Sequence, residues 1–471
     1  MLSIVNALIY TVALVSVFVS DEYGVLSSIL LFTAIVYASA ASQVAISISA
    51  RARGNATGMA LIPLIVFFWI AYVIKIPLLL TVPEASSLTN KFLSVSEMTS
   101  GIPAAFAIAS LGLTATVATI MCCKPNYYLD WNVYRVRYRV TPVICFVAIL
   151  LLIKYYVKYL WKLGIPGVEP ISMGVPYLGG FVALAIGDGI LFAVNSVLFL
   201  SLISGGRFTL LVGLTLALIN CFIDLSFGIK FTLLAQILLI VIYCSAINPN
   251  LSKTDPRVRS NLQYLLVATV IFAIPAIVFY KYLNFVRFAL LFDDINFVSA
   301  IGVALANENA IDRSSYFDFL NRFTGLDALS AVMQTFAEDF RSVGIMAVLD
   351  GRIIDQYSQL LLGGVDSKTQ FSLTLWGIWF LWGGVSGVIL GSVIIGIAFY
   401  SIQLLVSKLL PIPPVAKIVL LPIVWLSCAL LLMGGTSLFL WLKKMFVLLT
   451  FGLIFCRVIF RVPLSSPLQA N

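Results

Sequence analysis

The chain has 471 residues, of which 61% are hydrophobic and only 10% charged, and its mean hydropathy is +1.07. Soluble globular domains are nearer half apolar, so this composition excludes an ordinary soluble enzyme. The formal charge of +9 would indicate acidic partners for a soluble protein. In a membrane protein, basic loops that set the orientation account for such an excess, and we expect no nucleic-acid partner.

Several segments run 18 or more residues with little or no charge, which is enough to cross about 30 Å of hydrocarbon as a helix. The alternating pattern of a transmembrane β-barrel is absent. The sequence therefore predicts an all-α, polytopic membrane protein with about 12 transmembrane helices. They are expected near residues 2–20, 25–49, 59–82, 101–121, 142–162, 178–203, 208–226, 229–247, 262–282, 371–402, 415–434 and 437–458.

Two of these regions allow another interpretation. Residues 208–247 contain Asn220, Asp224 and Lys230, and could form one broken unit instead of two spans. The last span carries Lys443 and Lys444, which could mark an interfacial turn before a shorter helix.

Basic residues gather in alternate loops, as the positive-inside bias requires when both termini are cytoplasmic. The same count places residues 283–370 on the outer side. This loop holds 11 of the 20 acidic residues but only six basic ones, and apolar residues recur in it at roughly helical spacing. We expect a partly helical outer subdomain at 283–370, between an N-terminal bundle at 1–282 and C-terminal helices at 371–471.

The chain contains no histidine, which excludes histidine-based acid–base chemistry and histidine-ligated metals. No phosphate-binding loop of the P-loop type is present, so ATP-driven transport by this chain is not expected. We expect neither a metal nor another cofactor. Arginine, lysine and carboxylate side chains remain as candidates for chemistry.

The stretch SSYFDFLNRFTGLDALSAVM at 314–333 concentrates charge in the outer loop. Asp318 and Arg322 are four residues apart, in the order that favours a helical ion pair. Gly325 is suited to end that helix in a left-handed conformation, and Asp327 to cap the next one. The stretch is either an ordinary capped helix–turn–helix or a site in which Asp318 orients Arg322 towards a diphosphate, whose oxygens match a guanidinium fork.

Further loop residues suit the same chemistry. Arg313, Arg341 and Arg352 either bind a lipid-linked diphosphate at headgroup depth or merely offset the loop acids and reach to the interface. A general base would have to be a carboxylate. The eligible group is Asp293, Asp294, Glu308, Asp312 and Asp318.

Charged residues within spans are costly and are functional candidates by default. Asp188 lies between two glycines, and Asn195 follows two turns later on the same face, so the two either line a polar cavity or mark a helix break. Lys75 and Lys154 are nearer span ends and are expected to extend to the interface. Arg207 opens a span as an anion site or as a topology anchor.

Three stretches together resemble the Wzy-type O-antigen and capsule polymerases. SLISGGRFTLLVGLTLALI is similar to the Ser-Gly-x-Arg segment that opens a span in that family, and NRFTGLDALSAV resembles an Asn-Arg-x-x-Gly-x-Asp stretch of its large periplasmic loop. FSLTLWGIWFLWGGVSGVILGSVIIGIAFY resembles the span after that loop. The likeness covers roughly residues 200 to 400.

The resemblance implies a GT-C-like glycosyltransferase of the bacterial inner membrane with its active site facing the periplasm. Such enzymes transfer a growing polysaccharide from undecaprenyl diphosphate to a new lipid-linked repeat unit, without nucleotide sugar or metal, and some work with a chain-length regulator protein. By position, Arg207 and Arg322 would engage the lipid diphosphate. The candidate catalytic residues are then Arg322, Asp318, Asp312 and Asp327, with Arg207, Arg313, Arg341 and Arg352 for the diphosphate and Asp188 and Asn195 for a cavity.

Two departures from the family pattern and one topological conflict accompany this interpretation. A Pro-Arg…Trp…Lys-Pro stretch found late in the loop of some relatives is absent, and the related ligases use a loop histidine that this chain lacks. The span count also puts Arg207 on the cytoplasmic side, opposite to Arg322. The alternatives are a transporter or flippase of a lipid-linked oligosaccharide and an O-antigen ligase-like enzyme.

Overall fold

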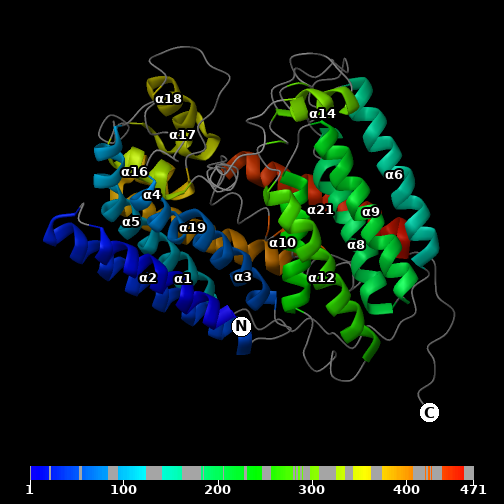
Figure 1. The fold of residues 1–471 in the computed structure, drawn as a ribbon, viewed down its shortest axis with the longest axis horizontal. Coiled ribbons are helices and arrows are strands. Elements are labelled where there is room, and N and C mark those ends of the chain that lie inside the picture. Colours follow the sequence, from blue (N-terminus) through cyan, green and yellow to red (C-terminus); the bar gives the residue numbers. More distant parts are fainter. Residues whose placement is uncertain are drawn as a thin grey trace. The chain divides into compact units, whose positions relative to one another are not determined.

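Figure 1 shows the computed structural model of the chain, in which all regular secondary structure of the described residues is helical. Contacts group the described helices into two units. Unit 1 comprises Met1–Tyr127, Phe317–Leu404 and Ser427–Leu442, and unit 2 comprises Tyr128–Tyr316, Leu405–Leu426 and Lys443–Asn471. The structure describes residues 2–20, 23–51, 56–82, 94–123, 140–161, 182–183, 185–204, 206–227, 231–246, 256–278, 282, 285–286, 289, 297–306, 325–334, 343–361, 374–406, 420, 423–424, 426 and 438–460.

Unit 1 is built around α5, which packs against α2, α16 and α19. A capping box starts α5, because Ser94 accepts from the Glu97 amide while the Glu97 carboxylate accepts from the Ser94 amide. The elements of unit 1 are α1 (Leu2–Val19), α2 (Val25–Arg51), α3 (Ala56–Phe68), η1 (Trp69–Val73), α4 (Lys75–Thr81), α5 (Val95–Cys122), α16 (Leu326–Gln334), α17 (Ile345–Asp350), α18 (Arg352–Leu361) and α19 (Leu375–Leu404).

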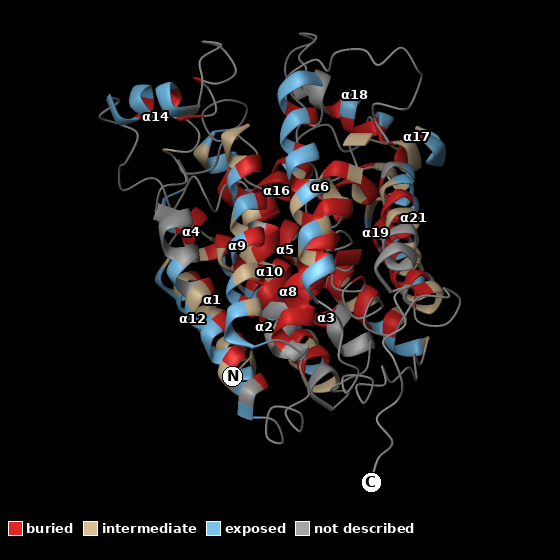
Figure 2. Cartoon of the chain, turned by 90° about the vertical axis from the view of Figure 1, so that its right-hand side faces the viewer, coloured by how far each residue is buried: buried red, intermediate tan, exposed pale blue. Residues whose placement is uncertain are grey.

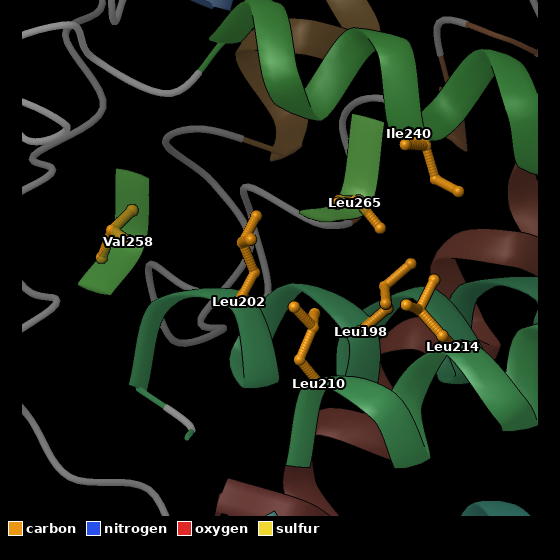
Figure 3. Packing of buried hydrophobic residues seen from close by; sticks show 7 residues of the cluster. All are labelled: Leu198, Leu202, Leu210, Leu214, Ile240, Val258 and Leu265. Carbon is orange, nitrogen blue, oxygen red and sulfur yellow. The ribbon is translucent and has the colours of Figure 1, made fainter. Parts of the chain in front are cut away.

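Unit 2 has a core of aliphatic side chains contributed by α8, α9, α10 and α12 (Figure 3). Helix α8 is buried along almost its whole length (Figure 2), whereas α6 leaves much of its surface exposed. The elements are α6 (Val140–Trp161), η4 (Ala185–Gly189), α8 (Ile190–Ser204), α9 (Arg207–Ser226), α10 (Phe231–Ala246), α12 (Pro256–Val278), α14 (Phe297–Ala306) and most of α21 (Leu438–Phe460).

Eight helices of the described residues are long and apolar enough to cross a membrane. Many of their outward side chains are large and apolar, such as Leu8, Leu152 and Phe208, which suits lipid better than water. Helices α10, α12 and α21 occupy the positions of three further predicted spans, and the span predicted at 415–434 lies mostly outside the described residues. The prediction of a polytopic, all-helical membrane protein is confirmed at this level.

The two regions with alternative interpretations are both resolved by the structure. Residues 208–247 form two separate helices, α9 and α10, and not one broken unit. The interfacial turn considered at Lys443 and Lys444 is wrong, because α21 runs through both lysines without a break.

Helix α19 is not the single straight span predicted at 371–402. Gly383 and Gly384 leave the helical conformation, and Gly384 has a φ of +57°. The indole of Trp376 donates to the Ser392 hydroxyl at 3.2 Å, although sixteen residues of straight helix would separate them by about 24 Å. A short arm at 375–382 therefore folds back on a long arm at 385–404.

The outer loop expected at 283–370 contains four helices in its described part, as its helical spacing predicted. These helices do not group together. Helix α14 belongs to unit 2, whereas α16, α17 and α18 belong to unit 1, where α16 packs against α4, α5 and α19.

Candidate functional site

In unit 1, the polar site is built around α16, a nine-residue helix buried within the bundle. Its first seven residues, 326–332, are all buried, including the polar Asp327 and Ser330. The apolar side chains of α16 that pack inside the bundle include Leu329 and Val332, which are completely buried. The described part of the predicted loop motif, residues 325–333, is thus packed within the helices of unit 1.

Lys75 of α4 and Asp327 of α16 form an ion pair with 2.8 Å between Nζ and Oδ2. Both side chains are completely buried, and the residues are 252 positions apart in the sequence. The second carboxylate oxygen of Asp327 accepts from the Gly325 amide at 3.1 Å. Removing one partner of such a pair would leave an uncompensated buried charge, so the two residues hold α16 against α4.

Small residues allow the close approach of α16 to its neighbours. A Cβ on Gly325 would come within 2.1 Å of the Ala71 carbonyl oxygen, and a Cβ on Gly101 within 2.3 Å of the Ser330 hydroxyl. Ser330 donates to the Met98 carbonyl at 2.7 Å, which adds a hydrogen bond to α5. Gly325 is therefore required for packing. Its predicted left-handed conformation is wrong, since the positive-φ glycines of the described residues are Gly351 and Gly384.

Aromatic side chains pack beside this ion pair. Tyr72 stacks on Phe68 at 5.1 Å and packs against Trp376 at 5.3 Å between ring centroids. Thr374 begins the short arm of α19, where its hydroxyl accepts from the Gly377 amide at 3.1 Å. Tyr72 and Thr374 are both buried. The site therefore contains a buried ion pair, aromatic side chains packed beside it, and the first turn of α19.

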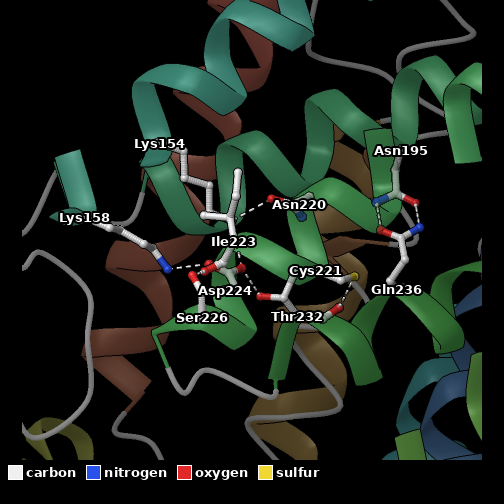
Figure 4. A network of polar contacts seen from close by, with 10 residues as sticks. All are labelled: Lys154, Lys158, Asn195, Asn220, Cys221, Ile223, Asp224, Ser226, Thr232 and Gln236. Atoms are coloured by element: carbon white, nitrogen blue, oxygen red, sulfur yellow. Dashed lines mark hydrogen bonds and ion pairs between the residues drawn. The ribbon is translucent and has the colours of Figure 1, made fainter. Parts of the chain in front are cut away.

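Unit 2 contains a second buried charged cluster, formed by α6, α9 and α10 (Figure 4). Lys154 donates to Asp224 Oδ2 at 2.7 Å and to Asn220 Oδ1 at 2.6 Å. Lys158 donates to the other oxygen of Asp224, and the Thr232 hydroxyl donates to Oδ2. The lysines are four residues apart on one face of α6, so both reach the same carboxylate.

Each cluster adjoins a π-helical segment. Lys75 follows η1 by two residues, and Asp188 lies within η4. A π turn inserts an extra residue into a helix, which redirects the side chains after it and is frequent at functional sites. Hydropathy does not reveal such a turn, although the two glycines beside Asp188 were a sign of an irregular helix at η4.

The expectation that Lys75 and Lys154 extend their amines to water is wrong, because both side chains are buried. Each is completely buried in an ion pair, and Lys158 is nearly so. The sequence did contain a signal for the charged cluster of unit 2. Lys154 and Lys158 are spaced i, i+4 on one apolar helix, and Asp224 lies on another. The partners could not be assigned without the fold.

Of the predicted catalytic residues, only Asp327 lies in the described part of the chain. It is not the N-cap that was predicted, because it follows the first residue of α16 and its carboxylate is committed to Lys75 and Gly325. Five other predicted site residues lie outside the described residues: Asp312, Arg313, Asp318, Arg322 and Arg341. The carboxylates Asp293, Asp294 and Glu308 lie outside them as well.

Arg352 lies at an exposed turn between α17 and α18, where Gly351 adopts a φ of +88°. Its backbone amide and Nε both donate to Asp350, at 3.0 and 2.7 Å. With 66% of its side chain exposed, Arg352 fastens this turn. Arg207 lies at the start of α9, is exposed, and donates to Ser260 of α12 at 3.3 Å.

Asp188 and Asn195 do not share one polar network in the structure. Asn195 is buried and exchanges two hydrogen bonds with Gln236 of α10, at 3.0 and 3.1 Å. Asp188 is partly exposed, and the charges of Lys444 and Lys154 act on it. Asn195 therefore joins two helices, whereas Asp188 belongs with the lysine cluster.

Among the described residues, no group of three or more metal-ligating side chains is close enough to hold a metal ion. Comparison of the chain with protein-family models, with curated proteins and with solved structures finds no match.

Proposed function

We propose that the chain is a GT-C-like membrane glycosyltransferase that polymerises undecaprenyl-diphosphate-linked oligosaccharide repeat units. The activity is assigned to the periplasmic face of the bacterial inner membrane. The proposal rests on the resemblance of three stretches to Wzy-type polymerases, within an all-helical chain that has eight candidate spans.

The observation that carries the proposal is the fastening of α16 to the bundle by the Lys75–Asp327 pair. Arg322 precedes Gly325 by three residues, and three residues of extended chain cover at most about 11 Å. Gly325 is buried against Ala71. We therefore expect the Arg322 guanidinium to act close to the start of α16, where it would bind the diphosphate.

In the proposed reaction, a hydroxyl of the acceptor sugar attacks the anomeric carbon that bears the carrier diphosphate. The new glycosidic bond forms as the bond to the diphosphate oxygen breaks, and a carboxylate takes the hydroxyl proton. Arg322 would stabilise the charge that develops on the leaving diphosphate. Asp318 and Asp312 remain the candidate bases, whereas Asp327 serves as a positioning residue because Lys75 holds its carboxylate.

The geometry of α9 favours the topology-anchor interpretation of Arg207. Arg207 opens this 20-residue helix and contacts the start of α12, while Asp224 lies near its other end. The start of α12 also carries Arg257 and Arg259. A cytoplasmic location of this basic end follows from the positive-inside bias.

The test is a purified, reconstituted protein supplied with lipid-linked repeat units and no nucleotide or metal. A ladder of lengthened products is expected. Arg322→Ala should abolish the ladder, while Arg352→Ala, a matched change in the same loop, should leave it intact because Arg352 binds Asp350 and fastens an exposed turn. An unchanged ladder with Arg322→Ala would remove this arginine from the mechanism.

A transporter or flippase of lipid-linked oligosaccharide is the second candidate. The observations that favour it are the buried ion pairs within spans and the broken helix α19, since discontinuous helices and intramembrane charges often line transport pathways. Movement of labelled lipid-linked substrate across proteoliposomes without lengthened product would favour this function. Transfer only to a non-repeat acceptor would indicate a ligase-like enzyme.

A further inference from the structure

The lysine cluster of unit 2 has more cationic groups than anionic ones. Lys154 and Lys158 face a single carboxylate, that of Asp224, and all three side chains are at most 4% exposed. Asp188 also interacts with Lys154 and with a further lysine, Lys444, so that three lysines face two carboxylates. One positive charge therefore stays uncompensated among the described residues, which is costly in a buried setting.

Hydrogen-bond donors are also in excess. Two ammonium groups provide six N–H donors, of which the described contacts use three. Asn220 is completely buried, and its side-chain nitrogen has no hydrogen-bond partner among the described residues. The carboxylate of Asp224 already accepts from Lys154, Lys158 and Thr232. Among the residues that the structure describes, these donors therefore lack an acceptor with negative charge.

The position of the cluster indicates where that acceptor comes from. Lys154 and Lys158 occupy the last two turns of α6, which also carry the exposed aromatic residues Tyr155, Tyr156, Tyr159 and Trp161. Tyrosine and tryptophan concentrate at the headgroup level of membranes. Lys158, the less buried lysine, lies 5.9 Å from the Phe227 ring centroid at the turn after α9.

We propose that Lys154, Lys158 and the amide of Asn220 form a binding site for a phosphate group. Phosphate supplies several charged acceptor oxygens, which match clustered ammonium and amide donors. Asp224 and Thr232 hold the lysines in place. Because the site belongs to unit 2 and Arg322 to unit 1, the inference does not depend on polymerase activity.

The test is native mass spectrometry of the full chain in maltoside micelles with phosphatidic acid or with diacylglycerol of the same acyl chains. Wild type should retain phosphatidic acid and not diacylglycerol. Lys158→Gln removes the excess charge and should weaken retention about tenfold or more, the value of one charged hydrogen bond. Asp224→Asn keeps the shape of the side chain and one acceptor oxygen but removes its negative charge. It should therefore strengthen the retention of phosphatidic acid.

Lys443→Gln is the matched control, because Lys443 is an exposed lysine of the same unit. It should retain phosphatidic acid as wild type does. A parallel arm with inorganic phosphate distinguishes the sources: stabilisation of the purified protein against heating by phosphate, without lipid retention, would identify free phosphate as the ligand. Equal retention of both lipids with no effect of phosphate would overturn the site, as would wild-type retention by folded Lys158→Gln.

Discussion

At the residue scale, the Lys75–Asp327 pair explains how helix α16 is held in unit 1. A lysine in an apolar helix is normally expected to extend its amine to water. Here η1 precedes Lys75, and the carboxylate that receives the amine comes from a residue 252 positions later. The pair fixes the position of α16, and it does so with two charges that are both buried.

Asp327→Ala should lower the free energy of unfolding by about 3–5 kcal/mol, since it leaves the Lys75 ammonium buried without a counter-charge. The double variant Lys75→Met/Asp327→Leu should recover most of that loss, because apolar side chains of similar size fill the same space. Unfolding in mixed micelles of SDS and a mild detergent measures both. A single variant as stable as wild type would show that the pair is not buried in the folded protein.

At the element scale, α19 shows why a hydropathy pattern cannot distinguish a span from a helical hairpin. All of its residues from 375 to 400 are uncharged and largely apolar, so the pattern predicts one continuous helix. Glycines determine that this segment folds back as a hairpin. Gly387 and Gly391 leave room for Trp379, and Gly384 supplies the positive φ at which the chain reverses.

Gly384→Ala should destabilise the protein by about 1–3 kcal/mol, because a φ of +57° with a ψ of −142° is a conformation essentially restricted to glycine. Gly383→Ala is a matched control, since Gly383 has a φ of −134° and an added Cβ meets nothing within 4 Å at either position. Only the backbone angle differs between the two sites. If both variants unfold alike in the same mixed micelles, the hairpin is not the folded conformation of α19.

The sequence predicted the helices of this protein better than the site that they form. Apolar runs specify spans because the length of a helix in lipid is set by the bilayer, and α1, α5 and α9 follow from that constraint alone. Partners of buried charges depend on which helices become neighbours. Neither the pairing of Lys154 with Asp224 nor that of Lys75 with Asp327 is encoded in local spacing.

At the scale of the whole molecule, exposed apolar surface and buried charge together describe a protein whose solvent is lipid. Helices α1 and α6 present leucine, isoleucine and aromatic side chains outward, while four charged residues of α4, α6 and α9 lie inside. A soluble protein arranges these groups the other way round. Each of these charged side chains takes part in an ion pair, although in unit 2 two lysines share one carboxylate.

The orientation of unit 2 follows from the same arrangement. Helix α9 is 20 residues long and covers about 30 Å, with Arg207 at its start and Asp224 near its end. Asp224 binds Lys154 and Lys158, so the last turns of α6 lie at the end of α9 that is opposite to Arg207. The start of α9 should therefore be cytoplasmic, and the end of α6 should face the other side.

Single cysteines at Gly206 and Trp161, introduced into a chain whose seven native cysteines are changed to serine, test this orientation. Both positions are exposed, and an added Cβ at Gly206 meets nothing within 4 Å. In intact cells with a permeabilised outer membrane, an impermeant maleimide should label the cysteine at 161 and not that at 206. Inverted vesicles should give the reverse. Labelling of both positions from one side would contradict the crossing of α9, and a reversed pattern would place the start of α9 on the outer side.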